Sequence, residues 1–170
     1  MAARDPVTRN RTNARNALAA IEKRIASPAE KRHQAGIELI QILQDPGRLW
    51  EERQRAKAAL MHMGDESLIP DLDQVLKTSQ DNHARMAAVE ILAGLPWSHE
   101  LQVTLLGQLH HVSPAVRRGA IVALGDIANR EALFYLGEAA REGDQPAELL
   151  SPEDARLARE AIQKIRKRVP

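Results

Sequence analysis

Cysteine is absent from all 170 residues of this sequence. Its absence excludes disulfide bonds, thiolate zinc sites and cysteine nucleophiles, and it is compatible with a reducing cytoplasm, where we expect the protein to act. No run of about 18 apolar residues occurs, so we expect no membrane span. The arginines near the N-terminus are followed by no apolar segment, and we therefore expect no secretory signal peptide.

Aromatic residues are also scarce. They make up 2% of the chain, whereas apolar residues as a whole make up 44%. Sheets draw on aromatic and β-branched residues, and closely packed helices draw on Ala and Leu. The composition therefore predicts an all-α fold, disfavours a β-sandwich or barrel, and leaves little material for an aromatic-lined cofactor pocket, so we expect no cofactor. The four rings are Trp50, Trp97, Phe134 and Tyr135.

Charge is distributed unevenly, although the formal net charge is only +1. Residues 1–32 and 151–170 are basic, and the body of the chain between them is acidic. A nucleic-acid-binding protein is expected to carry a continuous basic stripe. We therefore interpret the basic ends as solvated segments, with 1–12 as a flexible basic arm, and keep anion binding through these ends as an alternative.

Apolar residues recur at helical spacing along most of the chain. Between Ser113 and Asn129 they fall on one stripe at i, i+4, i+7, i+8 and i+11, and Ser113-Pro114 has the form of an N-cap followed by proline at the first helical position. Turn residues such as Asp45-Pro46-Gly47 separate the periodic segments. The pattern predicts helices over 13–25, 28–43, 48–63, 66–77, 82–94, 98–110, 114–128, 130–141 and 152–167.

An internal repeat appears when the chain is shifted by about 32 residues. The shift superimposes three helices at four positions, and a further shift of about 38 adds a fourth, degenerate copy. A period near 32 that contains two helices is typical of a helical solenoid, in which each pair buries its faces against its neighbours. The recurring positions are Arg53, Arg85 and Arg117; Ala56, Ala88 and Ala120; Leu60, Leu92 and Leu124; and Met63, Leu95 and Ile127.

The stretch SPAVRRGAIVALGDIANREALFYL carries a Val-Arg pair, an Ala and an Ala-Leu-Gly step in the order of a HEAT-like repeat. The stretches LQDPGRLWEERQRAKAALMHMGDESLIPDL and DNHARMAAVEILAGL fit the same frame, and SPEDARLAREAIQKI fits it less well. Over residues 28–168 the chain thus resembles the HEAT-like repeats of the phycobilisome-lyase type.

This resemblance implies an α-α superhelix (solenoid) of about four helix pairs, 28–64, 65–95, 96–128 and 129–168, behind an N-terminal cap helix at 13–25. The whole of 13–168 would form one domain. In the family, the recurring arginine ties neighbouring repeats by bonding acidic or carbonyl groups near the turns. Arg53, Arg85 and Arg117 would accordingly stabilise the array and would not bind a substrate.

No constellation for catalysis stands out. The chain has no G-x-S-x-G sequence and no H-E-x-x-H or other metal-spaced histidine pair. An up-and-down array could bring His83, His110 and His111 together at one edge, so a metal site there stays open. We otherwise expect no metal, no cofactor and no enzymatic activity.

The concave side of the array is the candidate binding surface. The helical wheel places residues of mixed charge there, with Met86 and Val122 as apolar contacts, whereas binding many phosphates would require mostly Lys and Arg. We therefore predict a protein-binding scaffold, compatible with a monomer, and keep nucleic-acid binding and a bilin-lyase-like role implied by the family as alternatives. Trp50 and Trp97, each beside a turn, are candidate edge anchors. The predicted contacts are Glu51, Gln54, His83, Met86, Glu90, Arg118, Val122, Asp126 and Arg156.

Overall fold

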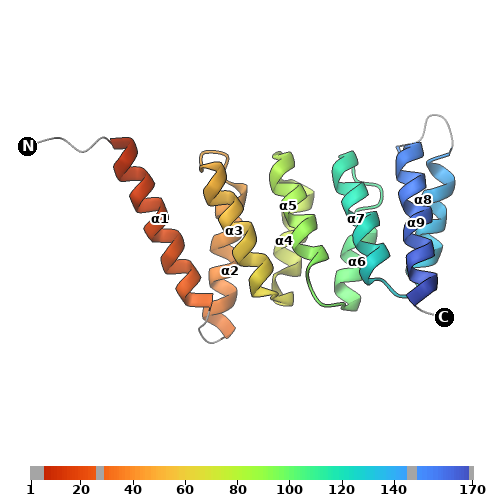
Figure 1. The fold of residues 1–170 in the computed structure, drawn as a ribbon, viewed down its shortest axis with the longest axis horizontal. Coiled ribbons are helices and arrows are strands. Elements are labelled where there is room, and N and C mark those ends of the chain that lie inside the picture. The colour runs from red at the N-terminus through yellow and green to blue at the C-terminus, as the bar shows by residue number, and fades with distance from the viewer. Residues whose placement is uncertain (1–5, 26–28, 145–148, 169–170) are drawn as a thin grey trace, which may run out of the picture. The chain divides into compact units, whose positions relative to one another are not determined.

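The structure is a computed structural model that describes residues 6–25, 29–144 and 149–168 (Figure 1). Over these ranges it contains nine α-helices and one short 3-10 turn, with no strand. The all-α prediction is therefore confirmed for the described part of the chain. Contacts divide the protein into two compact units, Met1–Asp71 and Leu72–Pro170, where the sequence predicts a single domain. We describe each unit by itself.

The first unit contains α1 (Pro6–Ile25), α2 (Ala29–Gln44), α3 (Trp50–Met63) and the 3-10 turn η1 (Glu66–Leu68). The three α-helices contact one another pairwise, and Leu39, Ala56 and Leu60 are buried in the core they share. α3 ends at Met63 and is capped by Gly64, whose left-handed φ of 57° lets the chain turn sharply. An ion pair between Arg55 and Glu22 joins α3 to α1.

α1 begins earlier than the sequence pattern predicts. It starts at Pro6, so residues 6–12 of the expected flexible arm are helical, while residues 1–5 lie outside the described ranges. Proline is favoured at the first helical position because its missing N–H would have no intrahelical partner there. The helix therefore begins at Pro6, although the residues that follow this proline are mostly polar.

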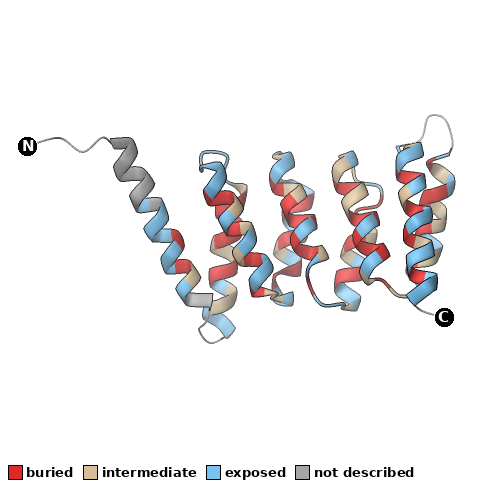
Figure 2. Ribbon diagram, viewed as in Figure 1, coloured by how far each residue is buried: buried red, intermediate tan, exposed pale blue. Residues whose placement is uncertain are grey.

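The second unit begins inside α4 (Ile69–Thr78) and continues with α5 (Asn82–Ala93), α6 (His99–Gly107), α7 (Pro114–Ile127), α8 (Ala132–Glu142) and α9 (Pro152–Arg168). α5 packs against α7, and α7 packs against α9, so these three helices lie side by side. α6 contacts α7 and α8, and α8 contacts α9, which forms a second layer. Buried residues lie along the facing sides of the helices (Figure 2).

Two predicted helices differ at their ends. The segment 66–77 starts as η1 and becomes α-helical at Ile69, because Pro70 lacks an N–H and disfavours an α-helix that begins further upstream. The segment 98–110 ends at Gly107 and closes with a turn at 108–110. The repeat frame agrees with burial within the second unit, where Ala88 and Ala120 are both fully buried.

Candidate functional site: a groove between α5 and α7

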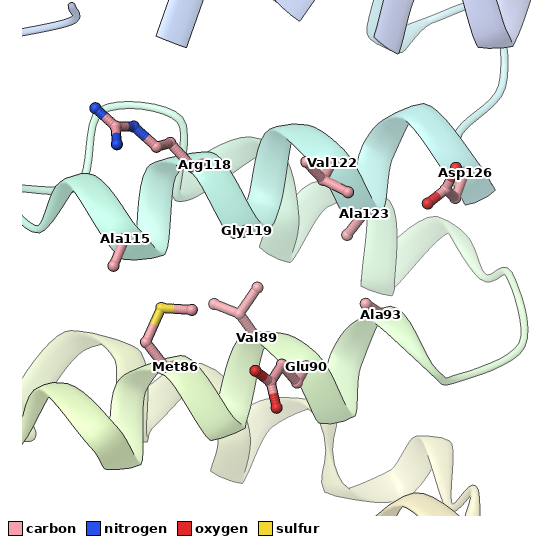
Figure 3. A pocket seen from close by; sticks show the side chains of 10 residues that line it. All are labelled: Met86, Val89, Glu90, Ala93, Ala115, Arg118, Gly119, Val122, Ala123 and Asp126. Carbon is pink, nitrogen blue, oxygen red and sulfur yellow. The ribbon is translucent and has the colours of Figure 1, made fainter. Parts of the chain in front are cut away.

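A groove of about 530 Å³ runs between α5 and α7 in the second unit (Figure 3). Its lining is mainly apolar. The groove is open to solvent, as the 43% exposure of Val122 on its wall indicates. Three charged side chains, Glu90, Arg118 and Asp126, lie among the apolar ones. The apolar and small lining residues are Met86, Val89, Ala93, Ala115, Gly119, Val122 and Ala123.

Small residues on α7 explain how the groove forms. Ala115, Gly119 and Ala123 recur every fourth residue and therefore share one face of the helix. A Cβ atom at Gly119 would lie only 2.7 Å from Cγ1 of Val89, so the glycine allows the Val89 side chain of α5 to pack closely against α7. The larger side chains of Met86 and Val122 stand on either side of this close approach and form the walls (Figure 3).

Arg118 is held in place by a buried carboxylate on α9. Its Nε donates a hydrogen bond to Oδ1 of Asp154 at 3.0 Å, and its side chain stays 42% exposed. The neighbouring Arg117, only 3% exposed, donates from Nη2 to Oδ2 of the same carboxylate at 2.9 Å. One negative charge thus serves two guanidinium groups, and the trio carries a net positive charge beside the groove.

Asp154 has no exposed surface, yet it remains ionised because its hydrogen bonds favour the charged form. Burial by itself raises the pKa of this carboxyl, but hydrogen bonds from the backbone and hydroxyl of Ser151 and from the two arginines outweigh it and bring the pKa below its usual value. The Ser151 Oγ in turn accepts from the Asp154 backbone N–H at 3.3 Å. This reciprocal pair is a capping box that starts α9.

The acidic groups lie further along the groove. Glu90 is exposed on α5, one helical turn after Met86. Asp126 is exposed near the end of α7 and forms an ion pair with Lys164 of α9, with 2.7 Å between Oδ1 and Nζ. The groove is therefore lined by one basic and two acidic side chains.

Five of the predicted contacts line this groove. They are Met86, Glu90, Arg118, Val122 and Asp126. His83 lies on α5 and Arg156 on α9, and both are exposed without lining the groove. Glu51 and Gln54 belong to α3 of the first unit, so they form no part of this groove.

The two tryptophans are half exposed. Trp50 is 55% exposed at the start of α3, and Trp97 is 50% exposed in the connection between α5 and α6. Tyr135 on α8 is 50% exposed and forms an edge-to-face pair with Phe134. None of these four rings lines the groove.

Two of the three histidines of the possible metal site form other contacts through their rings. Nε2 of His110 lies 2.8 Å from Oε2 of Glu142 on α8. Nε2 of His111 donates to the Leu76 carbonyl at 3.0 Å, and its Nδ1 accepts from the Ser113 backbone N–H. Within the described ranges, no group of three His, Asp or Glu side chains is arranged to hold a metal ion.

Arginines of the basic C-terminal segment form more contacts within the protein than the sequence suggests. Arg156 forms ion pairs with Glu153 and Glu160, and Arg159 forms one with Asp144. The guanidinium of Arg168 donates to the backbone carbonyls of Gly125, Asp126 and Ala128 at the end of α7. These contacts involve three of the six basic side chains that residues 151–170 offer to the anion-binding alternative.

Sequence reasoning missed the burial of Asp154, because an acidic residue in the first turn of a helix is favoured there by the helix dipole even at the solvated surface. The signal that could have placed it is Ser151-Pro152-Glu153-Asp154, which has the S-x-x-D form of a capping box. The role of Gly119 was also missed, although a glycine inside a strongly periodic helix often marks a close approach.

Comparisons with known proteins add nothing to this geometry: no known family matches the chain, and no curated protein matches it. Among the described residues, no helix is long and apolar enough to cross a bilayer.

Proposed function

We propose that the protein is a non-enzymatic scaffold, a solenoid of HEAT-like helix pairs that binds a protein partner through the α5–α7 groove. The observation that carries this proposal is an exposed apolar groove with a few charged side chains, one of which is held by a buried carboxylate. Such a combination is typical of protein-binding surfaces, in which an apolar centre gives affinity and polar groups at the rim give specificity. The 32-residue sequence frame supports the solenoid arrangement.

Photo-crosslinking tests this proposal with a matched pair of valines. Val122 lies on the groove wall, whereas Val112, 74% exposed, lies outside the groove in the same unit. We expect a benzoylphenylalanine introduced at position 122 to crosslink a distinct protein in cells, and the same group at position 112 to crosslink it far less.

A charge substitution provides the second half of the test. Val122→Asp places a carboxylate in the apolar part of the groove and should abolish the interaction, while Val112→Asp should preserve it. Circular dichroism should show the same helicity for both variants, because both side chains are exposed. Equal crosslinking from the two positions, or binding that survives Val122→Asp, would refute the groove as the binding site.

A further inference from the structure

The exposed side of α8 carries two of the four aromatic residues of the chain. Phe134 is 66% exposed and Tyr135 is 50% exposed, whereas the next residue, Leu136, is fully buried. The two rings meet edge to face, with 5.4 Å between their centroids and an interplanar angle of 84°. An edge-to-face contact uses only one of the four ring faces, so this exposed pair still presents negative π surface to a ligand.

Carboxylates accompany the two rings on the same side of α8. Residues four apart in a helix share a face, which places Glu138 one turn after Phe134 and Glu142 one turn after Glu138. Glu131, the N-cap residue of α8, lies one turn before Tyr135. Rings and carboxylates therefore alternate along one stripe that runs the length of the helix.

The first of these carboxylates is held by neutral groups. Oε2 of Glu131 accepts from Nε2 of Gln102 at 3.3 Å and from Nδ2 of Asn129 at 3.5 Å. Amides contribute dipoles but no charge, so these bonds position the exposed carboxylate without neutralising it. The adjacent cation, Arg130, has an interaction of its own.

The other two carboxylates form pairs that are open to solvent. Glu138 pairs with Arg141 of the same helix, and Oε2 of Glu142 lies 2.8 Å from Nε2 of His110. No side chain in these two pairs is less than 35% exposed, so each pair contributes little stability and can accept a further partner. Between positions 131 and 142 the exposed side of α8 has three carboxylates and one arginine, and this negative charge favours a basic occupant.

We propose that this stripe of α8 is a second docking surface, and that its occupant is an arginine-containing basic segment of a partner protein. A guanidinium group can stack on an aromatic ring and also donate to a carboxylate, whereas the ammonium group of lysine has no plane with which to stack. Nucleic acids and anionic membranes have the same sign of charge as the stripe and would be repelled. The inference goes beyond the proposed function, because α8, which is described throughout, contributes no residue to the α5–α7 groove.

A fluorescein-labelled peptide tests this surface by fluorescence anisotropy. The probe has three arginines separated by Gly and Ser, and its control has citrulline at the same positions, which keeps the planar group but removes the charge. We expect the arginine peptide to bind saturably with a Kd below about 1 mM, and the citrulline peptide to bind at least about fivefold more weakly. Added NaCl should weaken binding, because the charges involved are exposed.

Two double variants separate the effect of the rings from that of the charges. Phe134→Leu with Tyr135→Leu keeps an apolar surface and removes the π faces, whereas Glu131→Gln with Glu138→Gln keeps the shape and removes two charges. Each double variant should raise the Kd about threefold to tenfold. The control is Glu51→Gln, an exposed carboxylate of the first unit, which should leave the Kd unchanged. Circular dichroism should show the same helicity for all three proteins.

Fluorine NMR locates the bound peptide, because Phe134 is the only phenylalanine of the chain. Protein labelled with 4-fluorophenylalanine therefore gives a single resonance from this ring. We expect this resonance to shift saturably with the Kd that anisotropy gives. Val122→Asp, which changes the α5–α7 groove, should leave both measurements unchanged.

Five results would overturn the inference. These are equal affinity for the arginine and citrulline peptides, no saturable binding up to about 1 mM, binding that leaves the fluorine resonance unmoved, and binding that Val122→Asp abolishes. The fifth is a dimer in sedimentation that the double variant of the two rings dissociates, which would make the occupant a second copy of the chain. The proposed function is tested separately, since it fails only if position 122 crosslinks no protein.

Discussion

Replacing Asp154 by Asn is the most informative test of what holds the second unit together. The change keeps the size of the side chain but removes a charge that has no exposure to solvent. Asp154 accepts hydrogen bonds from Arg117 and Arg118 and from the backbone and hydroxyl of Ser151, at distances between 2.9 and 3.3 Å. An amide in this position would turn one donor group toward other donors and leave Arg117 buried without its counter-charge.

Breaking a buried ion pair by removing one partner typically costs about 3–5 kcal/mol. For a chain of this size, each kcal/mol corresponds to about 2–4 °C in Tm, so Asp154→Asn should lower Tm by about 6 °C or more. Thermal unfolding followed by circular dichroism measures the shift. Asp126→Asn is the control, because that carboxylate is exposed in its pair with Lys164 and should contribute at most about 1 kcal/mol. Equal Tm values for the two variants would refute the reasoning.

The pH dependence of the unfolding free energy gives an independent check, because the direction of the change follows from the lowered pKa of Asp154. Because the pKa of Asp154 is lower in the folded protein than its usual value, its contribution to stability is present above the ordinary pKa of about 3.9 and is lost as the pH falls through the folded-state pKa. The difference in unfolding free energy between wild type and Asp154→Asn should therefore be constant near neutral pH and shrink below about pH 4. A difference that grows on acidification would contradict this assignment.

Two further substitutions test the packing. Gly125→Ala should destabilise the second unit by about 1–3 kcal/mol, because the new Cβ would lie 2.9 Å from the Cα of Ala161. Gly137→Ala is the control and should be neutral or slightly stabilising, because nothing lies within 4 Å of its new Cβ. Thermal unfolding that ranks the two variants the other way would contradict this packing. Arg168→Ala should lower Tm by about 2–4 °C through the loss of donors to the α7 carbonyls, whereas Lys167→Ala, at an exposed neighbouring position, should not; equal shifts would show that Arg168 does not cap α7.

The helices could be predicted closely where the local signals are strong. Ser113-Pro114 places the start of α7 correctly, because an N-cap and a fixed φ are properties of two adjacent residues. Side chains on the α5–α7 groove could also be predicted, since five of its residues follow from the helical wheel and the repeat frame. Periodicity within a helix shows which face is exposed, and the register between repeats shows which exposed faces are equivalent.

Burial of Asp154 could not be predicted in this way, because it depends on contacts between helices that are distant in the sequence. The carboxylate is 37 residues from Arg117 and lies in the degenerate last copy of the repeat, where the recurring arginine is replaced by Ala155. From composition and spacing alone, this aspartate looks like any other acidic residue in the first turn of a helix. Only the packing of α9 against α7 brings it beneath both arginines.

Asp154 links the stability of the fold to the proposed recognition. Arg117 is buried and Arg118 is exposed beside the groove, yet both donate to the same carboxylate. An arginine that is already held loses less conformational freedom when it binds a partner, so the free energy of its contacts is retained more fully as affinity. The same carboxylate therefore fixes α9 against α7 through Arg117 and fixes the basic group of the groove through Arg118. It follows that Arg118→Gln should weaken binding with little loss of stability, whereas Asp154→Asn should weaken both.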